Sequence, residues 1–305
     1  MIRVIESGLQ TIPISSARHG MEQYGVPTGG PMDWVSHLLA NRLVGNEDAA
    51  GALEITLIPP KLLFQSACCI ALVGGEADFS LSRGGETRAI PMGQTAEVLP
   101  GDILHGSPMR VGMRAYLAIS GGILLPSIRA VALKRGDVLR LGGNAKTQWN
   151  RLMRLPRPVA ERFALLRVIS GVHAGRFSAE ALGLMRTSRY IYSGQSDRMG
   201  VRLEGAPLPF APGQDGNIIS EAVMQGDIQV TSSGQPILLT ADCQTVGGYA
   251  KIAHVITADL PIAGQLCPGA GVRFRFVSVE EAHGALKKLY REMDSGLIMP
   301  MQRKA

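Results

Sequence analysis

Mainly hydrophobic residues recur at the spacing of an α-helix in two stretches of the chain. The first follows Asp33, whose side chain is typical of a helix N-cap, and Gly45–Asn46 ends it. Its periodic residues are Val35, Leu38, Leu39, Arg42 and Leu43. The second begins with Ser278 and Glu281, which are spaced as a capping box. Its apolar face consists of Ala282, Leu286, Leu289 and Met293. The sequence therefore predicts two amphipathic helices.

Most of the remaining pattern is typical of β-strands. Short runs rich in Val, Ile, Leu and Thr are separated by turns that contain Gly and Pro. After a short opening strand and a Gly/Pro-rich loop at 18–33, the strands predicted in the first half are 52–57, 68–75, 95–104 and 114–123, with 133–143 closing this half. The second half starts with a strand in 165–173. Further strands are predicted around Tyr190, Val201, Ile228, Ile237, Val255 and Phe274.

This pattern predicts a mainly β fold with a few helices, organised as two β-rich lobes. Residues 144–163 are basic, interrupted by prolines and without strand alternation, so we interpret them as the connection between the lobes. The predicted N-terminal lobe is then 1–143, and the C-terminal lobe with its closing helix is 164–295. Residues 296–305 are predicted to be a frayed tail.

Composition and charge narrow the possible partners. Of the 305 residues, 46% are hydrophobic and 18% are charged, which suits a protein with a full core. The formal net charge is +6, but the Lys and Arg residues are scattered and only 5% of the residues are aromatic. This pattern argues against nucleic-acid binding. It fits attraction to an anionic substrate or to an acidic partner.

Neither a signal peptide nor a membrane helix is expected. Residues 1–14 lack an apolar core of sufficient length, and no window has the roughly 18 apolar residues that a span needs. Four cysteines, which form no CxxC pair, are interpreted as buried free thiols in a reducing compartment. They are Cys68, Cys69, Cys243 and Cys267. We therefore expect a cytoplasmic protein with no membrane contact.

Motifs for common cofactors are absent from the sequence. There is no GxxxxGK[ST] loop and no strand–GxGxxG–helix unit, so no nucleotide site is expected on this chain. The six histidines include no HxxxH or HExxH pair, so no metal site is expected. Pro300 stands between two methionines where a biotin carrier has its acceptor lysine, so the chain is not a biotin carrier.

Polar residues crowd the second lobe. They are Asp227, Gln229, Gln235, Asp242, Gln244, Thr245, Gly247, Gly248, Tyr249 and Lys251. Paired glycines let backbone N–H groups approach a ligand, and Asp242 and Lys251 offer a base and a cation. Alternatively, Gly247–Gly248 is a tight hairpin, Asp242 a turn cap and Lys251 a solvated charge. Spacing alone favours this alternative.

A second acid–base pair lies on a loop before a predicted strand. Asp197 and Arg198 precede Gly200, which permits backbone angles that other residues resist, and Arg202 follows in the strand. Two interpretations are open. The pair is either an exposed ion pair that contributes little, or its charges face a ligand.

Several long motifs carry a family resemblance. In the second lobe they are "SDRMGVRLEG", "SEAVMQGDIQVTSSGQPILLTADCQTVGGYAKIAHV" and "ADLPIAGQLCPGAGVRFRFVSVEEA". In the first lobe they are "RHGMEQYGVPTGGPMD", "LANRLVGNEDAAGALEITL" and "GMRAYLAISGGI". Over nearly its whole length the chain resembles the biotin-dependent carboxyltransferase family, also called allophanate hydrolase subunit 2. Members include the C subunit of 5-oxoprolinase, together with a module of urea carboxylase.

The resemblance implies a fold, partners and a reaction class. It implies that the C-terminal lobe is a cyclophilin-like β-barrel. It also implies a smaller partner with a related barrel (the B subunit of 5-oxoprolinase, or allophanate hydrolase subunit 1) and an active site where the two meet. The ATP-binding A subunit of 5-oxoprolinase is a further implied partner. No cofactor is expected on this chain, and ATP or carboxybiotin is expected on partner subunits.

The implied substrate is a small planar amide. The reaction is either ATP-dependent opening of 5-oxoproline to glutamate or carboxyl transfer to an amide nitrogen, and the chain alone is expected to be inactive. Such a substrate needs donors for its oxygen and an acceptor for its N–H group. The predicted catalytic residues are Asp197, Arg198, Asp242 and Lys251. The predicted substrate-binding residues are Arg202, Gln229, Gln235, Thr245, Gly247, Gly248, Tyr249, His19, Asn46 and Glu54.

The chain departs from the family pattern at three places. "PISSARHG" replaces the usual Gln-Asp-x-Gly-Arg, the segment after Ile123 lacks a loop, and Ala250 replaces the usual proline of the glycine turn. The missing loop leaves room for a second hypothesis, a regulatory binding protein that acts with a small-barrel partner. A third hypothesis, a prolyl isomerase, rests on fold analogy alone.

Overall fold

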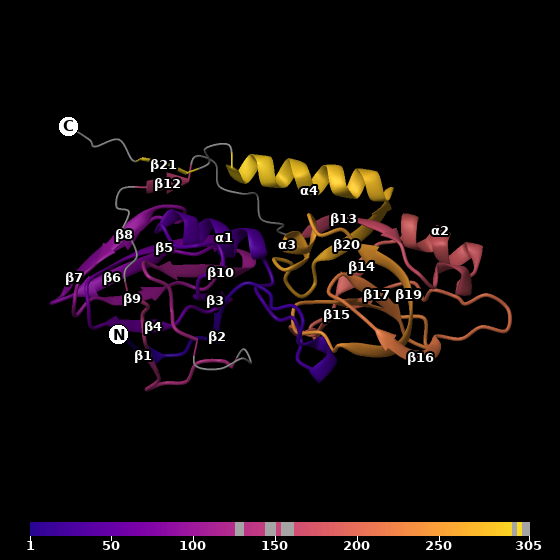
Figure 1. Cartoon of the computed structure of the whole chain (residues 1–305), viewed down its shortest axis with the longest axis horizontal. Coiled ribbons are helices and arrows are strands. Elements are labelled where there is room, and N and C mark those ends of the chain that lie inside the picture. The colour runs from indigo at the N-terminus through magenta and orange to yellow at the C-terminus, as the bar shows by residue number, and fades with distance from the viewer. Residues whose placement is uncertain (126–130, 144–150, 154–161, 295–297, 301–305) are drawn as a thin grey trace. The chain divides into compact units, whose positions relative to one another are not determined.

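The computed structural model describes residues 1–125, 131–143, 151–153, 162–294 and 298–300 (Figure 1). The chain forms two compact units. Unit 1 comprises Met1–Ser16, Asp33–Val159 and Glu292–Ala305, and unit 2 comprises Ala17–Met32 and Ala160–Arg291. These bounds differ from the predicted lobes, because the loop at 17–32 belongs to unit 2. A hydrogen bond from Arg198 to the carbonyl oxygen of Gly30 ties this loop to the unit, and no local sequence pattern signals such a contact.

Unit 1 contains two main antiparallel sheets. The strand order of the six-stranded sheet is β11 (Val138–Leu139), β1 (Ile2–Glu6), β4 (Lys61–Phe64), β9 (Ile103–Gly106), β6 (Phe79–Arg83) and β7 (Glu86–Ile90). The order of the five-stranded sheet is β2 (Gln10–Ile14), β3 (Ala52–Thr56), β10 (Val111–Ile119), β5 (Cys68–Glu76) and β8 (Thr95–Val98). A separate short ladder pairs β12 (Arg151–Met153) with β21 (Ile298–Pro300).

The core of unit 1 lies between its two main sheets. It is built from alternate residues of both, among them Ile2, Leu62, Phe64 and Phe79 from one sheet and Ile55, Ile70 and Leu117 from the other. The opposite face of the five-stranded sheet packs against α1 (Trp34–Leu43). Its central strands β5 and β10 are therefore buried on both faces, which explains their continuous apolar sequence.

Both predicted amphipathic helices are present. In α1 the Asp33 side chain accepts the backbone N–H of Ser36 at 3.0 Å, which confirms the predicted N-cap. Before α4 (Val279–Asp294), Ser278 Oγ accepts the N–H of Glu281 at 3.2 Å, and the Glu281 carboxylate accepts the N–H of Ser278 at 2.8 Å. The predicted capping box is therefore confirmed.

Unit 2 contains a closed β-barrel. The ring of seven strands has the order β13 (Phe163–Ser170), β20 (Gly271–Phe276), β14 (Tyr190–Tyr192), β15 (Gly200–Glu204), β18 (Pro236–Leu239), β17 (Asp227–Val230) and β19 (Val246–Val255). Pairing of β13 with β19 closes the ring. The predicted mainly β fold with a cyclophilin-like barrel in the C-terminal lobe is confirmed.

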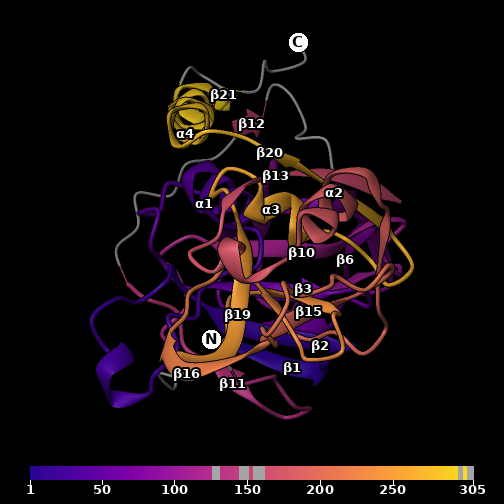
Figure 2. The same cartoon turned by 90° about the vertical axis from the view of Figure 1, so that its right-hand side faces the viewer.

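β19 is a long strand with different neighbours along its length. Its first part, from Val246 to Tyr249, pairs with β16 (Asn217–Ala222). Its second part pairs with β17 and β13. Figure 2 shows β16 beside the bend of β19. β16 is thus an edge strand attached to the barrel, next to the glycine pair that the sequence singled out.

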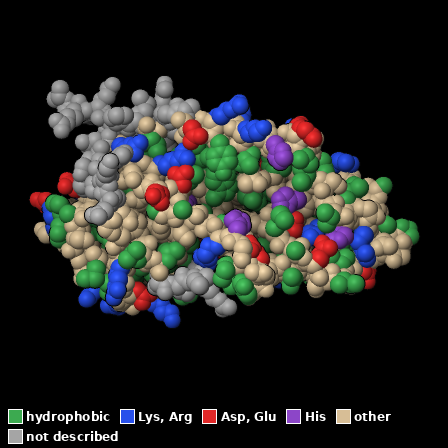
Figure 3. Space-filling model, viewed as in Figure 1, with side chains coloured by type: hydrophobic (Ala, Val, Ile, Leu, Met, Phe, Trp, Pro, Cys, Tyr) green, Lys and Arg blue, Asp and Glu red, His purple; other side chains and the backbone are tan. Residues whose placement is uncertain are grey.

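The interior of the barrel is apolar, and short helices flank it. Core residues include Val168, Tyr190, Val201, Leu238, Ile252 and Val272. The helices are η1 (Glu22–Tyr24), η2 (Ala174–Arg176), α2 (Ala179–Thr187) and α3 (Leu260–Ala263). None of the helices in the described part of the chain combines the length and the apolar character of a membrane span. On the face in Figure 3, basic and acidic side chains are interspersed, as the scattered charges of the sequence suggest.

Several elements are not predicted by the pattern. β7 and β16 expose most of their residues, so they lack the alternation by which strands are recognised. The predicted strand 95–104 is divided into β8 and β9 by a turn in which Asp102 accepts the N–H of Leu99. Strand β12 lies within the predicted connection and β21 within the predicted tail. The predictions for 144–150, 154–161, 296–297 and 301–305 lie outside the described residues.

Candidate functional site

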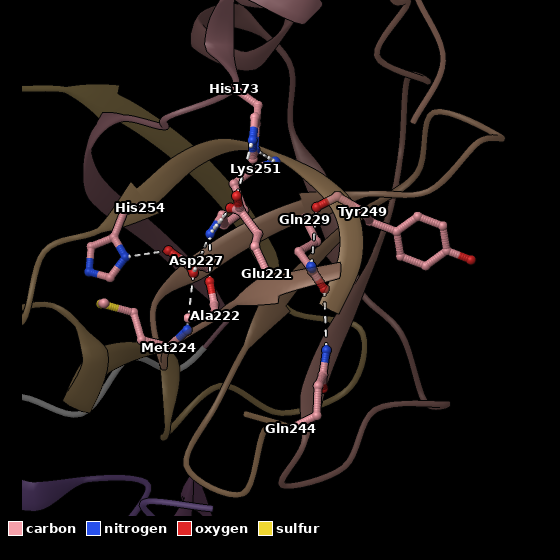
Figure 4. Close-up of polar contacts among 10 residues, drawn as sticks. All are labelled: His173, Glu221, Ala222, Met224, Asp227, Gln229, Gln244, Tyr249, Lys251 and His254. Atoms are coloured by element: carbon pink, nitrogen blue, oxygen red, sulfur yellow. Dashed lines mark hydrogen bonds and ion pairs between the residues drawn. The ribbon is translucent and has the colours of Figure 1, made fainter. Parts of the chain in front are cut away.

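A cluster of charged side chains lies on β16, β17 and β19 of unit 2 (Figure 4). Its centre is Lys251, which is only 8% exposed. The ammonium group donates to the Ala222 carbonyl oxygen at 2.8 Å, lies 2.5 Å from Glu221 Oε1 and lies 3.9 Å from Asp227 Oδ2. A buried ammonium is costly unless oxygens balance its charge. Lys251 is therefore not the solvated charge of the alternative interpretation.

A β-bulge turns Lys251 and His254 to the same face of β19. Residues three apart on a regular strand point to opposite faces. Ile228 pairs with Ala253, however, while Gln229 pairs with Lys251, so β19 advances two residues where β17 advances one. The extra residue brings both side chains to one acid of β17.

That acid is Asp227, which is 7% exposed. Its Oδ1 lies 2.8 Å from Nδ1 of His254, and its Oδ2 accepts the backbone N–H of Met224 at 3.1 Å. Figure 4 shows Lys251 and His254 on opposite sides of this carboxylate. Asp227 therefore links the buried ammonium to an imidazole that is 21% exposed.

Glu221 connects Lys251 to a second histidine. Its Oε2 lies 3.7 Å from Nε2 of His173, and Nδ1 of His173 accepts the backbone N–H of Lys251 at 3.2 Å. The hydrogen bond from Lys251 lowers the pKa of Glu221, so the carboxylate is ionised at neutral pH. The Glu221 side chain is 41% exposed. The negative end of the cluster thus reaches solvent, while the positive charge stays buried.

Gln229, Gly247 and Gln244 lie beside this cluster. Gln229 donates to the carbonyl oxygen of Tyr249 at 3.2 Å, and its own oxygen accepts a hydrogen bond from Gln244 at 3.4 Å. A Cβ atom at Gly247 would lie 2.6 Å from Nε2 of Gln229. Gly247 therefore makes room for Gln229. It does not form a hairpin turn, because Gly247 and Gly248 both lie within β19.

The other predicted residues of this strand face outward or support its backbone. The ring of Tyr249 is 37% exposed and points away from Lys251 in Figure 4. The carbonyl oxygen of Thr245 accepts the N–H of Val223 at 3.2 Å. Gly248 faces the hydroxyl of Ser220 on β16. These residues are close to the charged cluster in the fold, but their contacts support the strand and do not extend the cluster.

Arg198, which is buried, and Asp242, which is partly exposed, form a pair elsewhere in unit 2. Nε and Nη2 of Arg198 donate to the two carboxylate oxygens of Asp242 at 2.7 and 3.0 Å, and Nη2 also donates to the Gly30 carbonyl oxygen at 2.8 Å. Arg198 is 5% exposed. Asp197 uses Oδ1 to accept the N–H groups of Met199 and Gly200. The catalytic roles predicted for this group stay predictions, and its contacts hold loops together.

Five of the predicted substrate-binding residues make their contacts away from the Lys251 cluster. Arg202 is exposed on β15, Gln235 donates to the Gly205 carbonyl oxygen, and His19 is 79% exposed beside Glu22. In unit 1, Asn46 accepts the N–H of Gly121 at 2.9 Å. Also in unit 1, Glu54 is fully buried and accepts a hydrogen bond from Tyr116 at 2.7 Å. Arg202, Gln235 and His19 therefore share unit 2 with the cluster but make none of its contacts, and Asn46 and Glu54 lie in unit 1.

Sequence reasoning missed Glu221, His173 and His254. His254 is three positions after Lys251, which predicts the opposite face of a regular strand, and no periodicity reveals the bulge. Glu221 lies on the exposed strand β16. The one available signal is the Gly226–Asp227 turn at the start of a predicted strand.

Metal and thiol chemistry have little support in this cluster. Among the residues that the structure describes, no group of three or more His, Cys, Asp or Glu side chains is arranged to hold a metal ion. Burial, with the nearby charges of Asp227 and Asp242, raises the pKa of the Cys243 thiol to about 11. This thiol is therefore protonated at neutral pH and is a poor nucleophile.

Comparisons with known proteins define the class of protein. The chain is 32% identical over 308 residues to the C subunit of 5-oxoprolinase from Escherichia coli (strain K12), and the alignment covers 92% of this chain and 93% of that protein. It is also 32% identical over 308 residues to urea amidolyase of Lachancea kluyveri, covering 89% of this chain and 16% of the relative. The crystal structure of the Kluyveromyces lactis urea carboxylase matches with a TM-score of 0.86 and 30% identity, covering 97% of this chain and 29% of that one.

These relatives are subunits or domains of enzymes. The family model described as carboxyltransferase domain, subdomain A and B, matches residues 24–276. The chain belongs to this family, and the resemblance seen in the motifs is confirmed. It spans nearly the whole of the bacterial relative but less than a third of the urea carboxylase chain.

Proposed function

We propose that this chain is a subunit of an amide-processing enzyme of the 5-oxoprolinase kind, which opens a cyclic amide with the help of ATP. The observation that carries the proposal is the buried Lys251 ammonium, balanced by Glu221 and Asp227, on a barrel of the carboxyltransferase family. The alignment over 93% of the bacterial 5-oxoprolinase C subunit supports this choice. Carboxyl transfer to an amide nitrogen is the related alternative, supported by the urea carboxylase match.

Lys251 has the chemistry to stabilise an amide oxygen. A positive charge fixed in a partly dry environment stabilises the negative charge that develops on a carbonyl oxygen during the reaction. Glu221 and Asp227 hold the ammonium group in place. The adjacent Gln229 supplies amide hydrogen-bonding groups. These residues orient and polarise a planar amide, whereas ATP or carboxybiotin, bound on partner subunits, supplies the driving force or the carboxyl group.

The residues of this chain do not fit a nucleotide or a biotin of its own. No phosphate-binding loop is present in the sequence, and no lysine occupies the biotin-acceptor position between the two methionines. The proposal therefore includes two partners, a small-barrel protein and an ATP-binding protein. It follows that the isolated chain turns over no substrate.

Reconstitution tests the proposal. The chain is purified alone, with its small-barrel partner, and with both the small-barrel and the ATP-binding partners. ATP hydrolysis that depends on 5-oxoproline is then measured, with urea plus a biotin carboxylase partner as the comparison. We expect turnover only in the complete mixture. Full activity of the single chain, or no amide-dependent turnover in any mixture, would contradict the proposal.

A further inference from the structure

The Asp227–His254 pair has the arrangement of an oriented base. A carboxylate at neutral pH only accepts hydrogen bonds, so Nδ1 of His254 must donate the proton in the 2.8 Å contact with Asp227. The neutral imidazole is then fixed in the tautomer whose Nε2 carries a lone pair. In the described part of the chain, Nε2 makes no hydrogen bond. In this tautomer the lone pair is available for a proton from outside the pair.

Gly226 leaves room for the imidazole ring of His254. Gly226 has a φ of +101°, and a Cβ atom there would lie 3.0 Å from Nε2 and 2.9 Å from Cε1 of His254. Glycine therefore satisfies both the backbone angle and the space that the ring needs. The His254 side chain is 21% exposed, whereas the Asp227 side chain is 10% exposed. The imidazole is thus more accessible to solvent than the carboxylate that it contacts.

The charged groups around His254 support the same arrangement. Asp227 on β17 faces the ring directly, and Lys251 on its own strand β19 contacts the other oxygen of that carboxylate. The residue paired with His254 on β13 is Ile169, which has no charge. A carboxylate that is held by an ammonium on one side can stabilise an imidazolium that forms on the other side.

We infer that His254 is the proton-transfer group of this protein and that Asp227 is its positioning residue. The inference rests on the proposed function. During the reaction Nε2 of His254 takes the proton of an amide N–H group, and the electron pair of that bond stays on the nitrogen. The imidazolium, paired with Asp227, afterwards gives the proton to the departing nitrogen or to solvent.

Two readouts test the inference. The first is the nitrogen NMR signature of His254 in the isolated chain, which we expect to show a protonated Nδ1 and an unprotonated Nε2 in the neutral form of the ring. The second is turnover of the reconstituted complex. We expect His254→Gln to lower kcat by roughly a hundredfold or more, with KM nearly unchanged, and to remove the acidic limb of the pH profile. Asp227→Asn should lower kcat and alter the tautomer of His254. The exposed His283→Gln on α4 is the matched control, expected to change neither.

The outcomes separate this inference from the proposed function. A neutral His254 with its proton on Nε2 overturns the inference whatever the activity. If His254→Gln turns over at the wild-type rate with an unchanged pH profile, the inference is also overturned. The proposed function then still stands. If the wild-type complex is inactive on every amide, the proposed function fails, and the catalytic role of His254 fails with it. The thermal midpoint of each variant shows whether a loss of activity is caused by unfolding.

Discussion

Arg198 donates two hydrogen bonds to Asp242 and a third to the carbonyl oxygen of Gly30, a geometry that suits a guanidinium and not an ammonium. Arg198→Lys should therefore lower the free energy of unfolding by about 1 to 3 kcal/mol. Arg202→Lys on the exposed part of β15 is the control, expected to stay within about 0.5 kcal/mol of wild type. Thermal unfolding of both variants measures the difference. Equal stability of the two, with activity lost only in Arg198→Lys, would show instead that Arg198 contacts the substrate.

His37 on α1 makes the stability of the folded protein depend on pH. The side chain is 1% exposed, and burial lowers its pKa to about 4. An unfolded histidine titrates near pH 6.5, so the unfolded chain binds more protons between pH 4 and 6.5 and stability is lost as the pH falls through that window. We expect a loss on the order of 1 to 2 kcal/mol from pH 7 to pH 5 in wild type. His37→Gln should remove this part of the loss, whereas the exposed His283→Gln should not. An equal pH dependence in both variants would contradict the assignment.

At the scale of elements, the irregular part of β19 decides where the charged side chains of the cluster lie. His254 pairs with Asp227 across the strands, the bulge in β19 brings Lys251 to the same face, and the glycine turn before β17 leaves room for the His254 ring. Gly226→Ala should therefore destabilise unit 2 and displace His254, because the new Cβ meets the ring as well as an unfavourable φ. Gly213→Ala is the matched control, since Gly213 has a φ of +75° but nothing within 4 Å of an added Cβ.

Comparison of the two glycine variants separates the destabilisation caused by contact with His254 from the destabilisation caused by backbone strain. We expect Gly226→Ala to cost at least about 1 kcal/mol more than Gly213→Ala in thermal or urea unfolding. The NMR signals of His254 should move only in the first variant. Equal costs and an unmoved His254 would mean that Gly226 is needed for its backbone angle alone.

Regular elements can be predicted from the sequence, and irregular ones cannot. The two helices are recognisable because Asp33 and Ser278 mark their starts chemically, and the buried strands because their apolar runs are bounded by turns. The exposed strand β16 has no apolar alternation, so the sequence gives no sign of Glu221. A family motif predicts Lys251, but its placement on the same face of β19 as His254 depends on a bulge that local periodicity does not encode.

Long-range contacts limit the prediction of the other site residues. Arg198 and Asp242 are both predicted to be catalytic, and the structure joins them across 44 positions in the sequence. Which atoms of Arg198 remain for a ligand depends on that pairing and on Gly30, which lies in a loop remote in sequence. Glu54 carries a charge that suggests a function, yet it is buried in unit 1 against Tyr116.

At the scale of the whole molecule, the chain combines a two-sheet unit with a barrel unit. The charged cluster lies entirely in the barrel unit, on β16, β17 and β19. Unit 1 therefore contributes no member of the Lys251 cluster among the described residues. We propose that this cluster carries out the chemistry of a multi-subunit enzyme that acts on amides.

The most direct test is turnover of the reconstituted complex that contains Lys251→Met, a change that keeps the length of the side chain and removes its charge. Lys287→Met on the exposed face of α4 is the matched control. Each rate is normalised to the folded fraction from thermal unfolding, because Glu221 and Asp227 lose their partner in the first variant. We expect a loss of roughly a hundredfold or more in kcat for Lys251→Met and wild-type turnover for Lys287→Met. Equal, wild-type turnover in both variants would contradict the proposal.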